Sequence, residues 1–258
     1  PVLAHCEDIN LVNGGVMNED AHSKELGLRG ITNSVEDIIV ARDIMLSGDT
    51  GAKLHLCHCS TRDSVKMVRY AKMEQMKVTA EVCPHHFTLT SDDMIPKDTN
   101  YKMNPPLRTK EDVEELKRGL KEDIMDVIAT DHAPHTADEK NNSMEKAPFG
   151  IVGLETAAAL THTELVLKDY LTPMQMAEKM SCNPARILGL DAGSLEEGKP
   201  ADIVIFDPKK TYRIDKNKFW SKGRNTPFDG REVTGAVLTT IVEGKIAYDI
   251  KMDHEITK

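Results

Sequence analysis

The sequence predicts an α/β fold in which a parallel sheet is followed by a small β-rich segment. Short apolar runs alternate with helical patterns, each run ends in polar residues, and patterns punctuated by Gly and Pro begin near residue 191. Alternation of strands and helices specifies right-handed crossovers and a parallel sheet. Near-continuous apolar runs are typical of parallel strands covered on both faces. The predicted strands lie within 1–5, 52–58, 77–86 and 125–135.

Three amphipathic patterns predict the helices between these strands. The first helix begins at Ser34. For the second we expect Ser60 to be the N-cap, because its hydroxyl can accept a hydrogen bond from a backbone N–H of the first turn. In the third, Thr109 and Asp112 have the spacing of a capping box. The predicted helices span 34–49, 60–75 and 109–123.

Two more helices are predicted after the fourth strand, at 153–168 and 172–190. The second has Thr172 as its cap and Pro173 at the first helical position. Short β-rich runs with Gly and Pro turns then follow. The sequence therefore predicts two parts, 1–190 and 191–258.

Composition favours a protein that acts on a small molecule. The 258 residues carry a formal net charge of -9 and no basic stripe, which argues against nucleic-acid binding. No signal peptide and no apolar run long enough to span a bilayer is present, so we expect no membrane partner and a cytoplasmic protein. The five cysteines lack disulfide spacing. Cys57 and Cys59 could bind a soft metal, but we expect structural thiols.

Metal-ligand residues follow the predicted strands. The strands end at His5, His58, His85 with His86, and Asp131. Because active sites of parallel α/β folds lie at the carboxyl ends of the strands, three or four N and O ligands would share one rim, which is a set suited to zinc. A zinc-bound water ionises near neutral pH. Asp131 could take its proton and pass it to a leaving nitrogen, so the pattern predicts metal-assisted hydrolysis.

Two loops have the composition of substrate contacts. The segment 101–108 contains consecutive prolines and is expected to display Asn104 and Arg108. The segment 145–156 contains Gly and Pro, and its backbone could approach a ligand closely. From the residues alone, a surface loop with turn residues is an equally good interpretation of each segment.

These motifs together resemble those of the long bacterial dihydroorotases of the amidohydrolase superfamily, over essentially the whole chain. The resemblance rests on "AHCED", "CHCST", "AEVCPHH", "YKMNPPLR", "ATDHAPH" and "EKAPFGIVGLET". The family's fold is a TIM-like (β/α)8 barrel with a binuclear zinc site. Its reaction is the reversible cyclisation of N-carbamoyl-L-aspartate to dihydroorotate in pyrimidine synthesis. The runs "GSLEEGKPADIVIFD" and "VLTTIVEGKIAYD" resemble the closing half of its small β-sandwich.

The resemblance implies a role for each motif residue. His5 and His58 would be ligands of the second metal, and Asp131 both a metal ligand and the catalytic acid and base. His85 and His86 are not principal ligands in the family, so here they are expected to be structural, and His132 to give local support. The implied substrate-binding groups are Asn104, His135 and the backbone of Phe149 and Gly150.

The chain departs from the family in one respect. The His-x-His-x-Arg motif of the first barrel strand has no counterpart, nor does the bridging carboxylate or carboxylated lysine. We therefore expect the chain to be the C-terminal half of the barrel, strands five to eight, with part of the β-sandwich. The complete enzyme would hold two zinc ions and this fragment one or none. The fragment is expected to be inactive alone and to associate with the missing N-terminal half or with another copy.

Two alternatives remain from the sequence. Related cyclic amidases, such as hydantoinase, dihydropyrimidinase and allantoinase, share the barrel but usually differ in the "TDHAPH" and "NPPLR" segments. A non-catalytic dihydroorotase-like subunit that scaffolds aspartate transcarbamoylase is the second. Such subunits tend to lose metal ligands, whereas His5, His58 and Asp131 are present.

Overall fold

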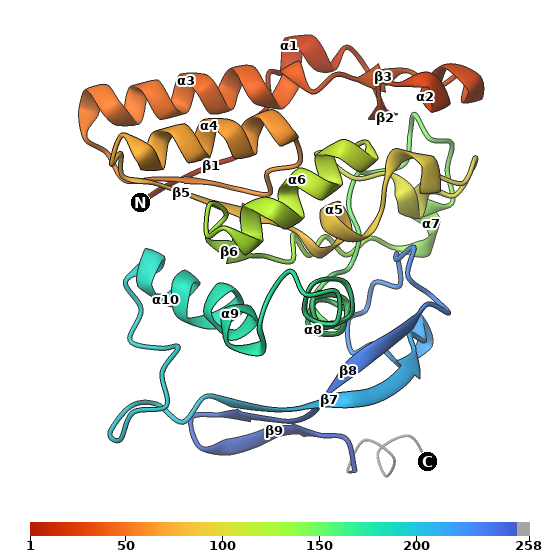
Figure 1. Ribbon diagram of the computed structural model, residues 1–258. Coiled ribbons are helices and arrows are strands. Elements are labelled where there is room, and N and C mark those ends of the chain that lie inside the picture. Colours follow the sequence, from red (N-terminus) through yellow and green to blue (C-terminus); the bar gives the residue numbers. More distant parts are fainter. Residues whose placement is uncertain (252–258) are drawn as a thin grey trace. The chain divides into compact units, whose positions relative to one another are not determined.

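The computed structural model describes residues 1–251, so the last seven positions of the predicted β-rich segment lie outside the described residues. The chain divides into two compact units (Figure 1). The first comprises 1–155 together with 215–229, and the second comprises 156–214 together with the described residues from 230 to 251. The predicted boundary at residue 190 stays a prediction.

The first unit is built on a four-stranded parallel sheet, as the sequence predicted. Its order is β1-β4-β5-β6, and each neighbouring pair is parallel. Each predicted apolar segment supplies one strand, shorter than the segment itself. The third segment ends early because Pro84 and the residues after it form helix α5 (Pro84–Thr88). The strands are β1 (Val2–Ala4), β4 (Leu54–Leu56), β5 (Val78–Val82) and β6 (Val127–Ile128).

Burial differs between the strands of this sheet. Every residue of β4 is buried, and β5 alternates between buried and half-buried positions. β1 is not covered as predicted: Val2 is 58% exposed and Leu3 is 54% exposed. The reason is that β1 is an edge strand, paired with β4 alone in the described sheet.

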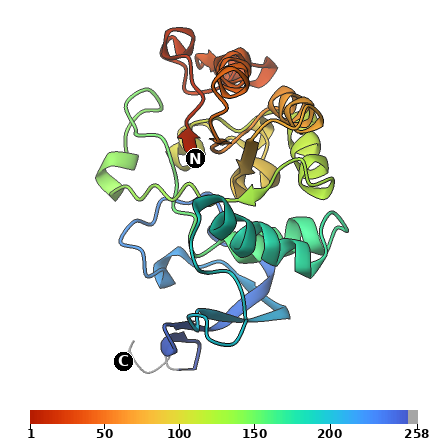
Figure 2. The same cartoon turned by 90° about the vertical axis from the view of Figure 1, so that its left-hand side faces the viewer.

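Three long helices connect the strands, and each leads the chain into the next parallel strand. The three helices lie beside one another (Figure 2). They are α3 (Ser34–Thr50), α4 (Arg62–Met73) and α6 (Lys110–Lys121). Their apolar faces pack closely: a Cβ at Gly119 of α6 would lie 2.8 Å from Val65 Cγ1 of α4.

The helix caps follow the sequence in part. Thr109 and Asp112 form the predicted capping box at the start of α6. The prediction for Ser60 is wrong, because Thr61 caps α4 by accepting a hydrogen bond from the Ser64 N–H at 3.0 Å. Ser60 instead donates its hydroxyl to the buried carboxylate of Glu36. A charged partner in the interior holds this hydroxyl away from the helix end.

Residues 9–33 form an insertion of two short helices and two short strands between β1 and α3, which the sequence patterns did not predict. Two parallel strands of two residues each pair within it. Strands this short leave no periodicity to read. Its elements are α1 (Ile9–Val12), β2 (Met17–Asn18), α2 (Ala21–Leu26) and β3 (Gly30–Ile31). The remaining short elements of the first unit are η1 (Ser91–Asp93), η2 (Thr99–Tyr101), α7 (Ala137–Lys140) and η5 (Lys216–Lys218).

The second unit contains helices and a three-stranded antiparallel sheet of order β7-β8-β9. Both predicted helices are present, and each includes a π-helical turn. Thr172 caps the second of them through a capping box with Gln175, as predicted. The elements are α8 (Ala157–Thr161), η3 (His162–Val166), α9 (Pro173–Ala177), η4 (Glu178–Cys182), α10 (Asn183–Leu188), β7 (Ile203–Arg213), β8 (Glu232–Val242) and β9 (Lys245–Asp249). Among residues 1–251, no helix combines the length and apolarity that a membrane crossing requires.

Candidate metal and substrate site

Three of the predicted site residues follow strands of the parallel sheet: His5 follows β1, His58 follows β4 and Asp131 follows β6. Parallel strands bring these ends to the same edge. Two of the three have a left-handed backbone, with φ 36° at His58 and 47° at Asp131. Residues other than glycine seldom adopt this conformation, and it concentrates at functional sites.

The structure brings His5 and His58 into direct contact. His5 Nδ1 lies 2.8 Å from His58 Nε2, and the ring centroids are 4.7 Å apart. The other nitrogen of His5, Nε2, lies 3.3 Å from Glu7 Oε2. Since an ionised carboxylate only accepts hydrogen bonds, the proton of a neutral His5 belongs on Nε2. The Nδ1 lone pair then faces His58, which is the arrangement of a metal-binding imidazole oriented by a carboxylate.

Glu7 also reaches a predicted substrate residue. Asn104 donates from Nδ2 to Glu7 Oε1 at 2.8 Å. The two oxygens of one carboxylate therefore bind His5 on one side and Asn104 on the other. The side chain of Glu7 is 17% exposed, so this link is partly shielded from solvent.

The loop that carries His58 is held by Glu81 of the neighbouring strand β5. The backbone N–H of His58 donates to Glu81 Oε1 at 3.1 Å, and Glu81 Oε2 lies 3.0 Å from His55 Nε2. Among the described residues, His58 Nδ1 is buried without a hydrogen-bond partner. The nitrogen of His58 that faces His5 is the other one, Nε2, so Nδ1 of His5 and Nε2 of His58 are the pair of atoms that fits a divalent cation.

Burial, together with the negative charge of Asp131, raises the pKa of two nearby cysteines, Cys57 and Cys83. The pKa of the Cys57 thiol is raised to about 11, first by burial and then by the negative charges of Glu81 and Asp131. Cys57 directly precedes His58, so the Asp131 carboxylate is near the end of β4. Burial, followed by the charge of Asp131, also raises the pKa of Cys83. These thiols stay protonated near neutral pH and are free cysteines.

The helix α5, rather than a strand end, carries His85 and His86. Together with Cys83 they offer three buried ligand atoms within 4.8 Å of one another. His86 Nε2 donates to the Pro105 carbonyl at 2.9 Å. Burial, with a smaller effect of His58, lowers the pKa of His85 to about 3, so its imidazole is neutral. The charge effect of His58 on both His85 and His86 shows that this cluster lies close to His58.

The loop after β6 joins two predicted substrate residues. His135 Nε2 lies 2.8 Å from the Phe149 carbonyl. Gly150 has φ 107°, and a Cβ there would lie 2.5 Å from Ala133 Cβ, so only glycine fits. His132 accepts a hydrogen bond at Nδ1 from the Gly153 N–H at 3.0 Å, consistent with the local support expected of it.

Asn225 ties this loop together from a distant part of the sequence. Its Nδ2 donates to the carbonyls of Ala133 and Gly150, at 2.9 and 3.1 Å, and its Oδ1 accepts from the His135 N–H at 3.1 Å. Asn225 is 5% exposed. Its three side-chain hydrogen bonds therefore hold both sides of the loop in one arrangement.

Two buried lysines hold the same loop through backbone carbonyls. Lys140 Nζ donates to Pro148 and Gly150, both at 3.0 Å, and Lys102 Nζ donates to Ala147 at 2.6 Å. Lys102 Nζ also lies 4.3 Å from the centroid of the Phe149 ring. Burial, followed by the charge of Lys102, lowers the pKa of Lys140 to about 8.

Arg108 is not displayed as predicted. Its side chain is 1% exposed, and Nε donates to Ser60 Oγ at 3.1 Å while Nη2 lies 3.8 Å from Glu36 Oε2. Nη1 also donates to Asn18 Oδ1 at 3.1 Å. The guanidinium therefore anchors the Pro-containing loop in the interior rather than contacting a ligand.

Sequence reasoning missed the residues that hold the site: Glu7, Glu81, Lys102, Lys140 and Asn225. Glu7 had a signal, because it lies within the "AHCED" motif beside His5. Glu81 and Lys102 also lie within quoted motifs, "AEVCPHH" and "YKMNPPLR", whereas Lys140 and Asn225 lie in none.

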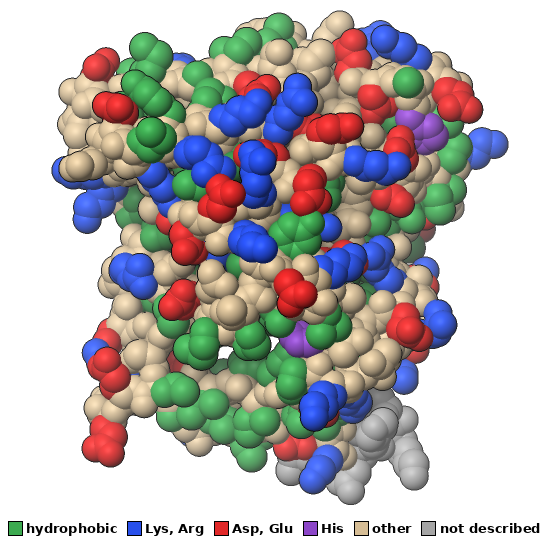
Figure 3. Space-filling model, in the orientation of Figure 1, with side chains coloured by type: hydrophobic (Ala, Val, Ile, Leu, Met, Phe, Trp, Pro, Cys, Tyr) green, Lys and Arg blue, Asp and Glu red, His purple; other side chains and the backbone are tan. Residues whose placement is uncertain are grey.

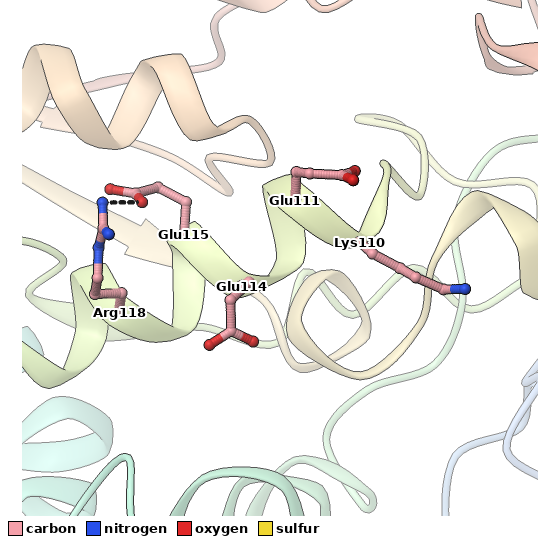
Figure 4. A pocket seen from close by; sticks show the side chains of 5 residues that line it. All are labelled: Lys110, Glu111, Glu114, Glu115 and Arg118. Carbon is pink, nitrogen blue, oxygen red and sulfur yellow. Dashed lines mark ion pairs between the residues drawn. The ribbon is translucent and has the colours of Figure 1, made fainter.

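A surface hollow on α6 contains none of the predicted site residues (Figure 4). Arg118 and Glu115 form an ion pair at its edge. Acidic and basic side chains are interspersed over α4 and α6 (Figure 3). We interpret the hollow as part of a solvated helix face. It is lined by Lys110, Glu111, Glu114, Glu115 and Arg118.

The chain is similar to curated dihydroorotases. It is 52% identical over 245 residues to the dihydroorotase of Pelotomaculum thermopropionicum, which covers 95% of this chain and 57% of that protein. It is 48% identical over 257 residues to the dihydroorotase of a Thermoanaerobacter species, which covers 100% of this chain and 59% of that protein. The resemblance in the motifs is thus confirmed, while the chain spans little more than half the length of these relatives.

Solved structures with this fold are larger proteins. The dihydropyrimidinase of Brevibacillus agri matches with a TM-score of 0.86 at 24% identity, over 97% of this chain and 57% of that one. The L-hydantoinase of Arthrobacter aurescens matches with a TM-score of 0.83 at 26% identity, over 96% of this chain and 56% of that one. Residues 1–247 match the model of the "Amidohydrolase family". Because this model matches nearly the whole chain, the chain belongs to the amidohydrolase family.

Proposed function

We propose that this chain serves dihydroorotase activity, the reversible cyclisation of N-carbamoyl-L-aspartate to dihydroorotate in pyrimidine synthesis. The observation that carries the proposal is the His5–His58 contact, with nitrogens 2.8 Å apart, in a chain about half identical to curated dihydroorotases. His5, His58 and Asp131 would hold zinc, which supplies a more acidic water and polarises the substrate carbonyl when it is bound.

The chain's own residues would position and protonate the substrate. Asp131 would accept the proton of the attacking water and deliver it to the leaving nitrogen during ring opening, with the reverse transfer during cyclisation. Asn104 and His135 would hydrogen-bond the substrate, and the backbone of Phe149 and Gly150 would line its other side. The links from Glu7 and Asn225 support this assignment, because they restrict the groups that must be aligned.

We further infer that the parallel sheet is the C-terminal half of a (β/α)8 barrel and that β7, β8 and β9 are part of a β-sandwich. The exposed side chains of Val2 and Leu3 on the edge strand β1 support completion of the sheet by further β/α units. These would come from a segment that supplies the other half of the barrel, or from another copy of this chain. The complete site would hold two zinc ions, and the chain alone one or none. The assembly would be cytoplasmic, and aspartate transcarbamoylase is a candidate partner.

The test compares the chain alone with a complemented form. The purified chain is assayed with dihydroorotate, hydantoin and allantoin, before and after fusion to the part of the Pelotomaculum dihydroorotase that it does not match. We expect no turnover by the chain alone and turnover of dihydroorotate in preference to the other two by the fusion. Preference for hydantoin or allantoin would assign a different cyclic amidase, and the absence of any turnover by the fusion would favour a scaffold subunit.

Metal analysis tests the ligands independently of turnover. His58→Ala in the fusion is expected to lose bound zinc, while His22→Ala, which changes a histidine that contacts the Met94 carbonyl and Glu25, is expected to keep it. Unchanged zinc content in His58→Ala would exclude His58 as a ligand.

A further inference from the structure

We propose that Glu7 is a positioning residue that couples the metal ligand His5 to the substrate residue Asn104. The inference rests on the proposed function for the roles of these two residues, but the geometry stands by itself. Glu7 Oε2 lies 3.3 Å from His5 Nε2, and Glu7 Oε1 accepts from Asn104 Nδ2 at 2.8 Å. His5 and Asn104 come from different parts of the chain, and the Glu7 side chain contacts both.

Only a carboxylate accepts a hydrogen bond from both partners at once. It accepts on both oxygens, whereas an amide of the same shape presents one oxygen and one NH2 group. His5 must donate from Nε2 for its Nδ1 lone pair to face His58. Asn104 must turn its NH2 group toward Glu7, because its carbonyl oxygen would repel the carboxylate. One residue therefore sets the tautomer of a ligand and the orientation of a substrate amide.

The charge of Glu7 adds to its geometric effect. A carboxylate that accepts the second N–H of a ligating imidazole makes the other nitrogen a better donor to a cation, and loss of such a partner lowers metal affinity about 10- to 100-fold. The same carboxylate leaves Asn104 Oδ1 turned away from it, so that oxygen can accept from a substrate N–H. Binding of a cation at His5 and binding of substrate at Asn104 are thereby linked.

The test begins with the chain as it is, without metal or substrate. Long-range ¹H–¹⁵N correlation spectra of histidine-labelled protein report which ring nitrogen carries the proton. We expect His5 in the wild-type chain to be the Nε2–H tautomer, and Glu7→Gln to give a mixture of tautomers. The side-chain NH2 signals of Asn104 are expected to shift in the same variant. A merely structural glutamate would change the melting temperature without changing the tautomer.

Zinc titration of the same samples provides the second measurement. Glu7→Gln is expected to weaken zinc binding about 10- to 100-fold. The matched control is Glu25→Gln, which alters another His–Glu contact, between His22 Nδ1 and Glu25 Oε2 at 3.8 Å, where the Glu25 side chain is 80% exposed. Its effect on zinc affinity is expected to stay within twofold.

The outcomes separate this inference from the proposed function. An unchanged His5 tautomer together with zinc affinity within twofold of wild type in Glu7→Gln would overturn the coupling role. A response of the tautomer to Glu7→Gln, in a complemented enzyme that does not turn over dihydroorotate, would support the coupling and reject the proposed activity. Glu7→Asp, which keeps the negative charge, is expected to bind zinc more tightly than Glu7→Gln does.

Discussion

Replacement of Asn225 by alanine should loosen the loop that carries His135 and Gly150. The substitution removes three side-chain hydrogen bonds, to the Ala133 and Gly150 carbonyls and from the His135 N–H. Each buried bond contributes about 1 kcal/mol net. Because Asn225 is 5% exposed, its former partners stay buried and lack a replacement unless water enters. We expect the free energy of unfolding to fall by about 3 kcal/mol, or by about 1 kcal/mol if water restores two of the bonds.

Two assays check this prediction. Urea denaturation gives the change in the free energy of unfolding, and hydrogen exchange at the His135 amide reports the local bond. The matched control is Asn142→Ala, which removes contacts of an exposed asparagine with the Asp138 and Glu139 carbonyls and should cost less than about 0.5 kcal/mol. If Asn225→Ala costs no more than this control and the His135 amide stays protected, the loop is not held by Asn225 and the reasoning is wrong.

Two further perturbations probe the same loop. Gly150→Ala should destabilise by about 1–3 kcal/mol, because φ is 107° and the new Cβ would lie 2.5 Å from Ala133 Cβ. Thermal unfolding should show a larger loss than in Gly27→Ala, where φ is 65° but no atom lies within 4 Å; an equal loss would mean that the contact is unimportant. The pKa of Lys140 is about 8 in the folded chain, below its ordinary value of 10.5. Between these values the unfolded chain binds more protons, so the free energy of unfolding should gain a rising component with pH. Urea titrations should show this component in wild type and Lys146→Met but not in Lys140→Met; its persistence in Lys140→Met would assign it to another group.

The sequence was sufficient to predict an element where an apolar pattern repeats, and to predict a contact where the topology brings two strand ends together. The helices at Ser34, Thr109 and Thr172 have long periodicity or a capping pair. His5 and His58 meet because parallel strands carry their ends to the same edge. That argument needs only that the strands are parallel, which the alternation of strand and helix indicates.

The sequence was insufficient where a contact depends on a distant partner. In the sequence, Arg108 has the features of an exposed substrate-binding residue, but in the structure it is buried and contacts Glu36 and Ser60. Asn225 follows a stretch without periodicity, and its three partners lie more than 70 residues away in the chain. Ser60 lost its predicted capping role because a buried acceptor competes with the helix end. Tertiary pairing overrides local preference at each of these positions.

The left-handed backbones of His58 and Asp131 have a consequence for how the protein can change. At such positions glycine relieves backbone strain, so a search for more stable variants would favour replacing the very side chains that the proposed chemistry requires. A screen that selects only thermostability should therefore drift toward loss of activity at these two positions. A screen that selects turnover should retain them and gather its stabilising changes elsewhere in the chain.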